Sequence, residues 1–300
     1  MTSRMITRRD FLKAASAVPL AAAAGGAILP SLKAAPQAAG EKVKVVLVRD
    51  EGALDASGRP NAGVIQKMLD DAVTTLLGEN DPVKAWKTII RPEDTVGIKT
   101  NVWSYIPTTT EVEQAIRSRV LDAGVPADRI AIDDRGVLRN PVFQKATALI
   151  NARPARVHDW SGMGSLIKNY IMFVPNPSAW HGDTCADLAK IWFLPHVKDK
   201  TRLNIQVVLT PLFHGVGPHS YSKEYTWPYR GLIVSRDPVA ADATALRLLQ
   251  AKRKEYFKED KPIQPTAHHI FLADTRHRLG VSAEDRIELV RLGWQDGTLI

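Results

Sequence analysis

The sequence predicts an α/β protein with a mostly parallel sheet flanked by helices and a loop-rich insertion in the middle. Five short apolar runs rich in β-branched residues have the character of buried strands, at residues 42–49, 95–99, 129–133, 203–209 and 231–235. Helical spacing of apolar residues separates the first three runs. Strand–helix–strand repeats of this kind build parallel sheets with right-handed crossovers.

The first predicted helix follows a turn at residues 58–61. Val64, Met68, Ala72 and Leu76 recur at helical spacing, and Gly78 ends the run. These residues would cover one face of the sheet.

Two further helices are predicted from their amino-terminal residues. Thr110 and Glu113 have the spacing of a capping box, and Gly124 ends the helix that follows. Asp237 is placed to cap a helix whose first residue is Pro238.

The middle and the end of the chain have weaker patterns. Residues 157–199 are rich in Trp, Gly and Pro, which predicts a loop-rich insertion. Residues 284–300 are expected to hold one short helix. No low-complexity linker follows residue 40, so residues 41–300 are predicted to form a single α/β domain.

The amino terminus resembles a twin-arginine export signal. Residues 7–13 read TRRDFLK, an apolar run follows at 14–29, and small residues follow at 33–40. We expect residues 1–40 to be a signal peptide that engages the twin-arginine translocase, and the protein to be periplasmic or otherwise extracytoplasmic. Cleavage after Ala34 and after Ala39 are both open. A membrane is a partner only if the signal is uncleaved.

Charge and cysteine content exclude some functions. The chain carries a net charge of +8, of which residues 1–40 contribute +4, so half of the basic excess belongs to the signal and no nucleic-acid partner is expected. Cys185 is the only cysteine, so no iron–sulfur cluster ligated by cysteines is expected within one chain.

Polar residues follow several predicted strands, at the edge where parallel sheets bind ligands. They are Lys99, Asn101, Asp133, Asp134, Arg135, Thr210, His214, His219, Arg236 and Asp237. Asp134 and Asp237 have a purely structural alternative as caps of turns and helices. Lys99 ends a buried strand and should either be paired or face a ligand.

The middle insertion holds the second group of candidate residues. His158, Lys168 and Asn169 lie there, as do His181, Asp183 and Cys185. Imidazole, carboxylate and thiolate groups suit zinc or copper, so a divalent metal held by His181, Asp183, Cys185 and His214 is a candidate cofactor. The spacing matches no known metal signature, and inert packing is the alternative for a single buried cysteine.

A glycine-rich segment is the third candidate. Residues 213–221, FHGVGPHSY, place two glycines between His214 and His219, where backbone amides could hold an anion. A tight turn with hydrogen-bonded histidines is the structural alternative. His268, His269 and His277 are interpreted mainly as structural or surface residues.

Together these segments resemble the family called domain of unknown function 362. The matching motifs are VGIKTN (96–101), TTTEV (108–112), DAG (122–124), LIKN (166–169), NPSAWHG (176–182), DKTRLNI (199–205), GPH (217–219) and SRDPVAAD (235–242). The resemblance covers about residues 45–250 and implies an α/β fold without an established activity. Many relatives carry a ferredoxin-like module with Cys-x-x-Cys repeats, which this chain lacks.

Three hypotheses follow. In the first, the protein is an exported enzyme with a catalytic set of His158, His181, His214 and Asp133. Its anionic ligand would be bound by Lys99, Asn101, Lys168, Asn169, His219 and Asp237. In the second, it is an accessory protein that binds a metal or cofactor for a redox or surface complex. In the third, it is a structural subunit whose Trp-rich insertion forms an interface.

Overall fold

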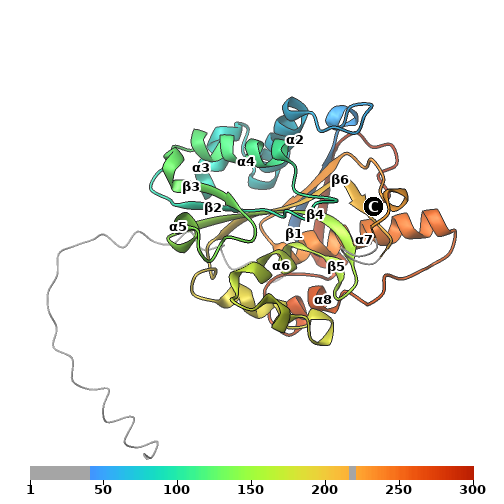
Figure 1. The fold of residues 1–300 in the computed structure, drawn as a ribbon. Coiled ribbons are helices and arrows are strands. Elements are labelled where there is room, and N and C mark those ends of the chain that lie inside the picture. The colour runs from blue at the N-terminus through green and yellow to red at the C-terminus, as the bar shows by residue number, and fades with distance from the viewer. Residues whose placement is uncertain (1–40, 216–220) are drawn as a thin grey trace, which may run out of the picture. The chain divides into compact units, whose positions relative to one another are not determined.

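A mixed eight-stranded sheet organises the chain in this computed structural model, which describes residues 41–215 and 221–300. The strand order is β3-β2-β4-β6-β7-β1-β8, with β5 paired to β4 (Figure 1). The strands are β1 (Val43–Arg49), β2 (Val96–Lys99), β3 (Ile130–Asp133), β4 (Ala148–His158), β5 (Gly162–Gly164), β6 (Thr201–Leu212), β7 (Gly231–Ser235) and β8 (Ile287–Gly293). The predicted α/β class is confirmed.

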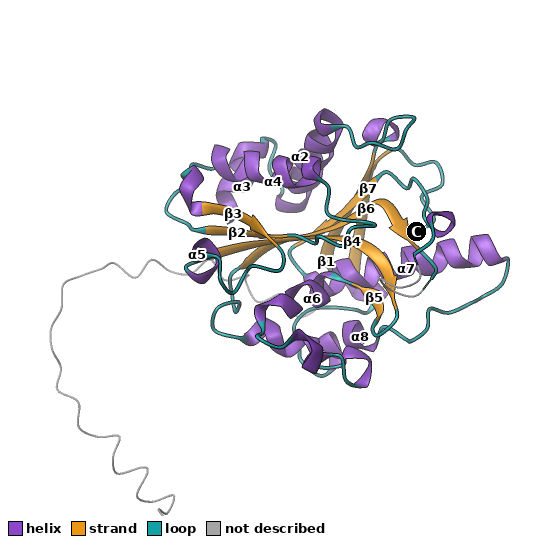
Figure 2. Ribbon diagram, viewed as in Figure 1, coloured by secondary structure: helices purple, strands orange, loops and turns teal. Residues whose placement is uncertain are grey.

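Helices cover both faces of this sheet (Figure 2). They are α2 (Ala62–Leu77), α3 (Pro82–Ile89), α4 (Thr110–Asp122), α5 (Pro141–Gln144), α6 (Leu166–Asn169), α7 (Pro238–Phe257) and α8 (His268–Thr275). Buried residues of α2, α3 and α4 pack on one face, and those of α5 to α8 pack on the other. None of the described helices is long and apolar enough to cross a membrane.

The sheet is mixed: β1 runs parallel to β8, and β5 runs antiparallel to β4. β2 runs parallel to β3 and β4, and β4 runs parallel to β6. β7 runs antiparallel to both β6 and β1. Residues that follow β7 therefore lie beyond the amino end of β6, on the opposite edge from residues that follow β6.

Several sequence predictions need correction. Residues 284–300 contain β8 after a single 3-10 turn, not the expected short helix, because Ile287 and Leu289 alternate with polar residues along an edge strand. Six further elements, α3, α5, α6, α8, β4 and β5, were not predicted from the sequence. β4 was obscured by its internal Asn151, Pro154 and two arginines, which are unusual in a buried strand.

The two predicted helix caps had different outcomes. Asp237 caps α7 as expected, because its Oδ1 accepts hydrogen bonds from the amides of Val239 at 2.7 Å and Ala240 at 3.0 Å. The capping box at Thr110 is wrong: Thr109 is the N-cap of α4, and it makes no side-chain capping bond.

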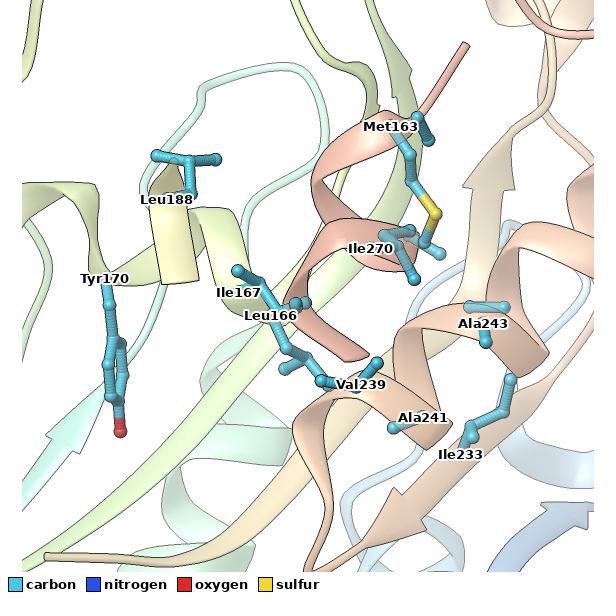
Figure 3. Close-up of a cluster of buried hydrophobic side chains, with 14 of the residues drawn as sticks. Met163, Leu166, Ile167, Tyr170, Leu188, Ile233, Val239, Ala241, Ala243 and Ile270 are labelled. Atoms are coloured by element: carbon cyan, nitrogen blue, oxygen red, sulfur yellow. The ribbon is translucent and has the colours of Figure 1, made fainter. Parts of the chain in front are cut away.

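The loop-rich insertion consists mainly of short helices with buried side chains. After α6 come the 3-10 turns η3 (Tyr170–Phe173), η4 (Pro177–Trp180), η5 (Asp183–Cys185) and η6 (Leu188–Phe193). Figure 3 shows Leu166 and Ile167 of α6 beside Val239 of α7 in this core. The rings of Tyr170 and Trp192 stack with centroids 4.2 Å apart. This packing fixes the backbone that carries Lys168 and Cys185.

Candidate functional site

A row of polar residues crosses one face of the sheet. Lys99 is in register with Asn151, Asn151 with Asn204, and Asn204 with Ser235. None of these four residues is exposed to solvent. Adjacent strands in register place their side chains on the same face, so the row lies beneath α6 and α7.

Amide side chains connect this row. Asn169 donates from Nδ2 to Asn151 Oδ1 at 2.8 Å, and Asn151 donates from Nδ2 to Asn204 Oδ1 at 3.3 Å. Asn169 also accepts from Lys99 Nζ at 3.2 Å. The predicted ligand residues Lys99 and Asn169 are thus brought together, and they are partners within the protein.

The charged partner of Lys99 is Asp134. Lys99 Nζ donates to the Asp134 carboxylate and, at 2.7 Å, to the carbonyl of Thr100. Burial lowers the pKa of Lys99 to about 8, and the Asp134 charge acts in the opposite direction. Burial opposes ionisation of Asp134, but the charge and hydrogen bond of Lys99, together with the hydrogen bond from the Val102 amide, hold the Asp134 pKa below its ordinary value.

Asp133, predicted as catalytic, has a different position. Its carboxylate accepts from the Gly136 amide at 2.8 Å and from Asn140 Nδ2 at 3.1 Å. These contacts stabilise the turn after β3. Asp133 therefore has a structural role in a turn, of the kind that was considered for the neighbouring Asp134.

Asn101 and Asp134 close a loop that we call the aromatic loop, residues 101–108. The Asn101 amide donates to Thr108 Oγ1 at 3.0 Å, and the Thr108 amide donates to the Asn101 carbonyl at 2.8 Å. Asp134 also accepts from the Val102 amide at 3.0 Å. The VGIKTN motif therefore anchors both ends of this loop.

Three cations lie close together on the same face as the polar row. Arg153, Arg156 and Lys168, which we call the cationic cluster, are between 3% and 6% exposed. Their mutual charge contributes to lowering the pKa values of Arg156 and Lys168, after burial as the main cause. The pKa of Lys168 falls to about 8 and that of Arg153 to about 10.

Arg153 Nη1 donates to the Ser165 carbonyl at 3.3 Å, but several other buried polar atoms of this cluster and of the neighbouring Gln206 have no hydrogen-bond partner among the described residues. They are Arg153 Nε, Arg156 Nε and Nη1, and both side-chain polar atoms of Gln206. Gln206 is in register with Arg153 and is not exposed to solvent. Nearly all buried polar groups in native proteins have partners, so these atoms are free to bind a water molecule or a ligand.

The absence of a side chain at Gly164 leaves space for the guanidinium groups of Arg153 and Arg156. A Cβ atom at this position would lie 2.9 Å from Arg153 Nη2 and 3.1 Å from Arg156 Nε. Below 3.0 Å something must shift, so any larger residue here would displace the arginines.

His158 lies within the field of this cluster. Its Nδ1 accepts a hydrogen bond from the Trp160 amide at 3.2 Å, which leaves the proton on Nε2. Burial, followed by the charges of Lys168, Arg153 and Arg156, holds the pKa of His158 far below its ordinary value. The imidazole is therefore neutral and available as a hydrogen-bonding group.

Cys185 contacts the cluster through Lys168. Lys168 Nζ donates to Cys185 Sγ at 3.5 Å, and burial raises the pKa of this thiol. Asp183, Thr184 and Cys185 all have positive φ angles, of 46°, 49° and 66°. This turn is costly for residues other than glycine, and it directs the thiol inward.

His181 lies at the outside of the same region. Its ring centroid is 4.6 Å from that of Trp160, which is 50% exposed. Burial and the charge of Lys168 lower the His181 pKa. Asp183 is exposed near it on η5.

Other predicted site residues are not joined to this group by any described contact. His214 Nδ1 is 2.9 Å from Arg253 Nη1, and its ring packs against Tyr225 and Phe257. Asp237 lies beyond the opposite edge of the sheet, where it caps α7 and also accepts from the Val281 amide at 2.9 Å. Burial raises the pKa of Asp237 to about 6. His219 falls outside the described residues.

The metal hypothesis stays a prediction. Among residues 41–215 and 221–300, no group of three or more His, Cys, Asp or Glu side chains is placed to hold a metal ion. His181 and Cys185 lie near the cationic cluster, whereas the contacts of His214 are with α7 and η7 (Lys223–Tyr225).

Arg153, Arg156 and Gln206 were not predicted as ligand residues, and a buried serine–histidine contact was not predicted either. Ser165 Oγ lies 2.8 Å from His269 Nε2, and neither residue is exposed. Asp242 accepts from the amides of Leu166 and Ile167, and burial raises its pKa to about 7. Polar residues at alternate positions in β4 and β6 were the available signal.

Comparison with known proteins identifies the export signal. Residues 5–25 match the family model for the twin-arginine translocation pathway signal sequence. The protein is therefore exported across the cytoplasmic membrane by the twin-arginine translocase, to the periplasm or another extracytoplasmic space. No curated protein and no solved structure matched the chain.

Proposed function

We propose that this exported protein is an enzyme that binds a small anionic molecule, such as a carboxylate or a phosphate, at the cationic cluster. The observation that carries the proposal is the set of unpartnered polar atoms on Arg153, Arg156 and Gln206. Guanidinium N–H groups are suited to oxygen anions, and leaving them buried without a partner is costly. An anion would supply these hydrogen bonds and offset the charge.

The balance of buried charge supports an anionic ligand over a neutral one. Four buried cations, Lys99, Arg153, Arg156 and Lys168, lie with two buried carboxylates, Asp134 and Asp242, and with the partly buried Asp159, whose charge also acts on Arg156. Lys99 and Asp134 neutralise each other. Asp242, with its pKa raised to about 7, carries only part of a charge near neutral pH.

The groups beside the cluster support catalysis in addition to binding. His158 is held neutral and Lys168 has a lowered pKa, and perturbed titratable groups near a ligand site are typical of active sites. In this proposal Arg153 and Arg156 bind the anion, and His158 donates a hydrogen bond to the reacting group.

We also propose that the chain belongs to the family called domain of unknown function 362. The motifs quoted from the sequence support this assignment. Asn101 of VGIKTN holds the aromatic loop, and Lys99 of the same motif bonds Asn169 of LIKN in the polar row, while Lys168 of LIKN belongs to the cationic cluster.

Thermal unfolding of the exported protein in sodium phosphate, sodium acetate and sodium chloride of equal ionic strength tests the binding step. Phosphate or acetate should raise Tm of the native sequence, by an amount that corresponds to about 2.7 kcal/mol at 100 times Kd. Arg156→Met should abolish the shift while leaving Tm without ligand unchanged or higher, because it removes buried N–H donors that have no hydrogen-bond partner and keeps an apolar side chain of similar length.

Arg119→Met is the matched control. It removes a guanidinium that is paired with Asp70 and Asp122 on the other face of the sheet, so the shift produced by the anion should persist. Absence of any shift with phosphate or acetate, or an equal shift in Arg156→Met, would overturn the proposed function.

A further inference from the structure

The aromatic loop places a set of rings directly beside the cationic cluster. The Arg156 guanidinium lies over the Trp103 ring, with its carbon 3.9 Å from the ring centroid. Tyr105 packs edge-on against Trp103 at 5.2 Å and stacks on Tyr221 at 4.6 Å, with 21° between the ring planes. One continuous surface thus joins the cation to three aromatic rings.

Part of this surface is open to solvent. Tyr105 is 54% exposed and Val102 is 48% exposed, whereas Trp103 beneath Arg156 is only 8% exposed. Tyr105 and Val102 are among six large hydrophobic side chains exposed on the described part of the chain, and both belong to the aromatic loop. Exposed apolar groups gathered beside convergent polar groups are typical of ligand sites.

The loop is held rigidly enough to present these rings. Its ends are joined by the two hydrogen bonds between Asn101 and Thr108. Thr108 Oγ1 also donates to the Ala152 carbonyl in β4 at 3.2 Å, and Asp134 holds the Val102 amide. These buried hydrogen bonds therefore fix the aromatic loop to β4, the strand paired with β2.

We propose that the ligand of the cationic cluster is an aromatic acid, whose carboxylate is bound by Arg153 and Arg156 and whose ring packs against Tyr105. This inference rests on the proposed function and names its ligand class. Arg156 is stacked on Trp103, so its N–H groups point outward in the plane of the guanidinium. A carboxylate bound there places its attached ring beside the aromatic loop, where edge or offset contacts with Tyr105 are favourable.

The test compares Kd values for benzoate, cyclohexanecarboxylate and acetate, measured by calorimetry on the exported protein. Benzoate should bind more tightly than cyclohexanecarboxylate, by about twofold to tenfold, since an aromatic pair contributes about 0.5–1.5 kcal/mol beyond its buried area. Tyr105→Leu should abolish this preference and leave acetate binding unchanged, because it keeps an apolar side chain and removes the ring. Phe193→Leu, at an exposed ring on η6, is the matched control and should preserve the preference.

A second pair of variants tests the anchoring of the loop. Thr108→Val should reduce the preference for benzoate by releasing the loop, and Thr108→Ser should restore it by keeping the hydroxyl. The two Tyr105 and Phe193 variants keep the test decisive if Thr108→Val fails to fold, because both positions are exposed.

The outcomes separate this inference from the proposed function. Binding of acetate with no preference for benzoate over cyclohexanecarboxylate overturns the aromatic ligand and leaves anion binding in place. An equal loss of acetate and benzoate binding in Tyr105→Leu also overturns it. Failure of all three acids and of phosphate to bind overturns both proposals.

Discussion

The two faces of the sheet are built from alternate residues of the same strands, yet they differ in chemistry. In β6, Leu203, Ile205 and Val207 join the apolar core under α2 to α4, whereas Asn204 and Gln206 point to the other face. The face of the sheet under α2 to α4 therefore contributes to stability alone. The other face combines stability with a concentration of buried polar groups that a fold alone does not need.

The polar face contains two kinds of buried cation. Lys99 has a carboxylate partner in Asp134, and Lys168 has only a thiol as a hydrogen-bond partner among the described residues. The first arrangement satisfies its charge within the protein. The second leaves a charge for a ligand, and this contrast separates the structural from the functional part of the polar face.

The largest predicted effect separates these two lysines. Lys99→Met should lower the free energy of unfolding by about 3–5 kcal/mol, because it leaves the Asp134 carboxylate buried and unpaired. Lys168→Met should change it by less than about 1 kcal/mol, or raise it, since no carboxylate loses its partner. Urea unfolding of both variants gives the comparison, and equal losses would contradict it.

The apolar face should tolerate truncation poorly without affecting ligand binding. Ile205→Ala should lower the free energy of unfolding by about 2–5 kcal/mol, through lost burial and the cavity that remains. The Tm shift caused by phosphate or acetate should be unchanged. A loss of that shift in a variant that is still folded would show that the two faces are not independent.

Acid should destabilise the polar face through its buried histidines. Burial, with the charges of Lys168 and Arg153, lowers the pKa of His269 from 6.5 to about 3. The unfolded chain therefore binds a proton more readily, and stability contributed by His269 is present above pH 6.5 and is lost as pH falls toward 3.

His269→Gln tests this pH dependence. It should reduce the slope of unfolding free energy against pH in that window, by up to about 1.4 kcal/mol per pH unit. Chemical unfolding at several pH values, with the native sequence beside the variant, measures the difference. Parallel curves for the two proteins would reject the assignment to His269.

The smallest effect concerns an ion pair on the surface of α2. Lys67 and Asp71 form an i,i+4 pair whose side chains are 69% and 44% exposed. Lys67→Ala should change the free energy of unfolding by no more than about 0.5 kcal/mol, because exposed pairs are screened by solvent. If Lys67→Ala lowered the free energy of unfolding as much as Lys99→Met, exposed and buried ion pairs would not differ in their contribution to stability.

Much of the fold could be predicted because its signals are local. The five predicted strands correspond to β1, β2, β3, β6 and β7, and Asp237 caps α7 as expected. β4 could not be recognised, because Asn151, Arg153 and Arg156 look unfavourable in a strand until a polar site covers them. β8 was missed because an edge strand is only half buried.

The candidate site was predicted less completely. Lys99, Asn169, Lys168 and His158 are in or beside the site, but the partner of Lys99 is Asp134, and the arginines with unpaired N–H groups come from β4. Asp237 and His214 were grouped with them because the predicted strands were expected to end at one common carboxyl edge of a mostly parallel sheet. The antiparallel direction of β7 places Asp237 at the opposite edge.

The sequence by itself determined the export route, the α/β class and the presence of polar residues that needed partners, since a signal peptide, hydrophobic periodicity and burial of charge are properties of short segments. Only the tertiary structure decided which partners these residues have. Strand order and register bring Lys99, Asn151 and Asn204 into one row, and they bury Arg153 and Arg156 with N–H groups that have no hydrogen-bond partner among the described residues. Those contacts join residues distant in the chain, and local patterns carry no information on strand order.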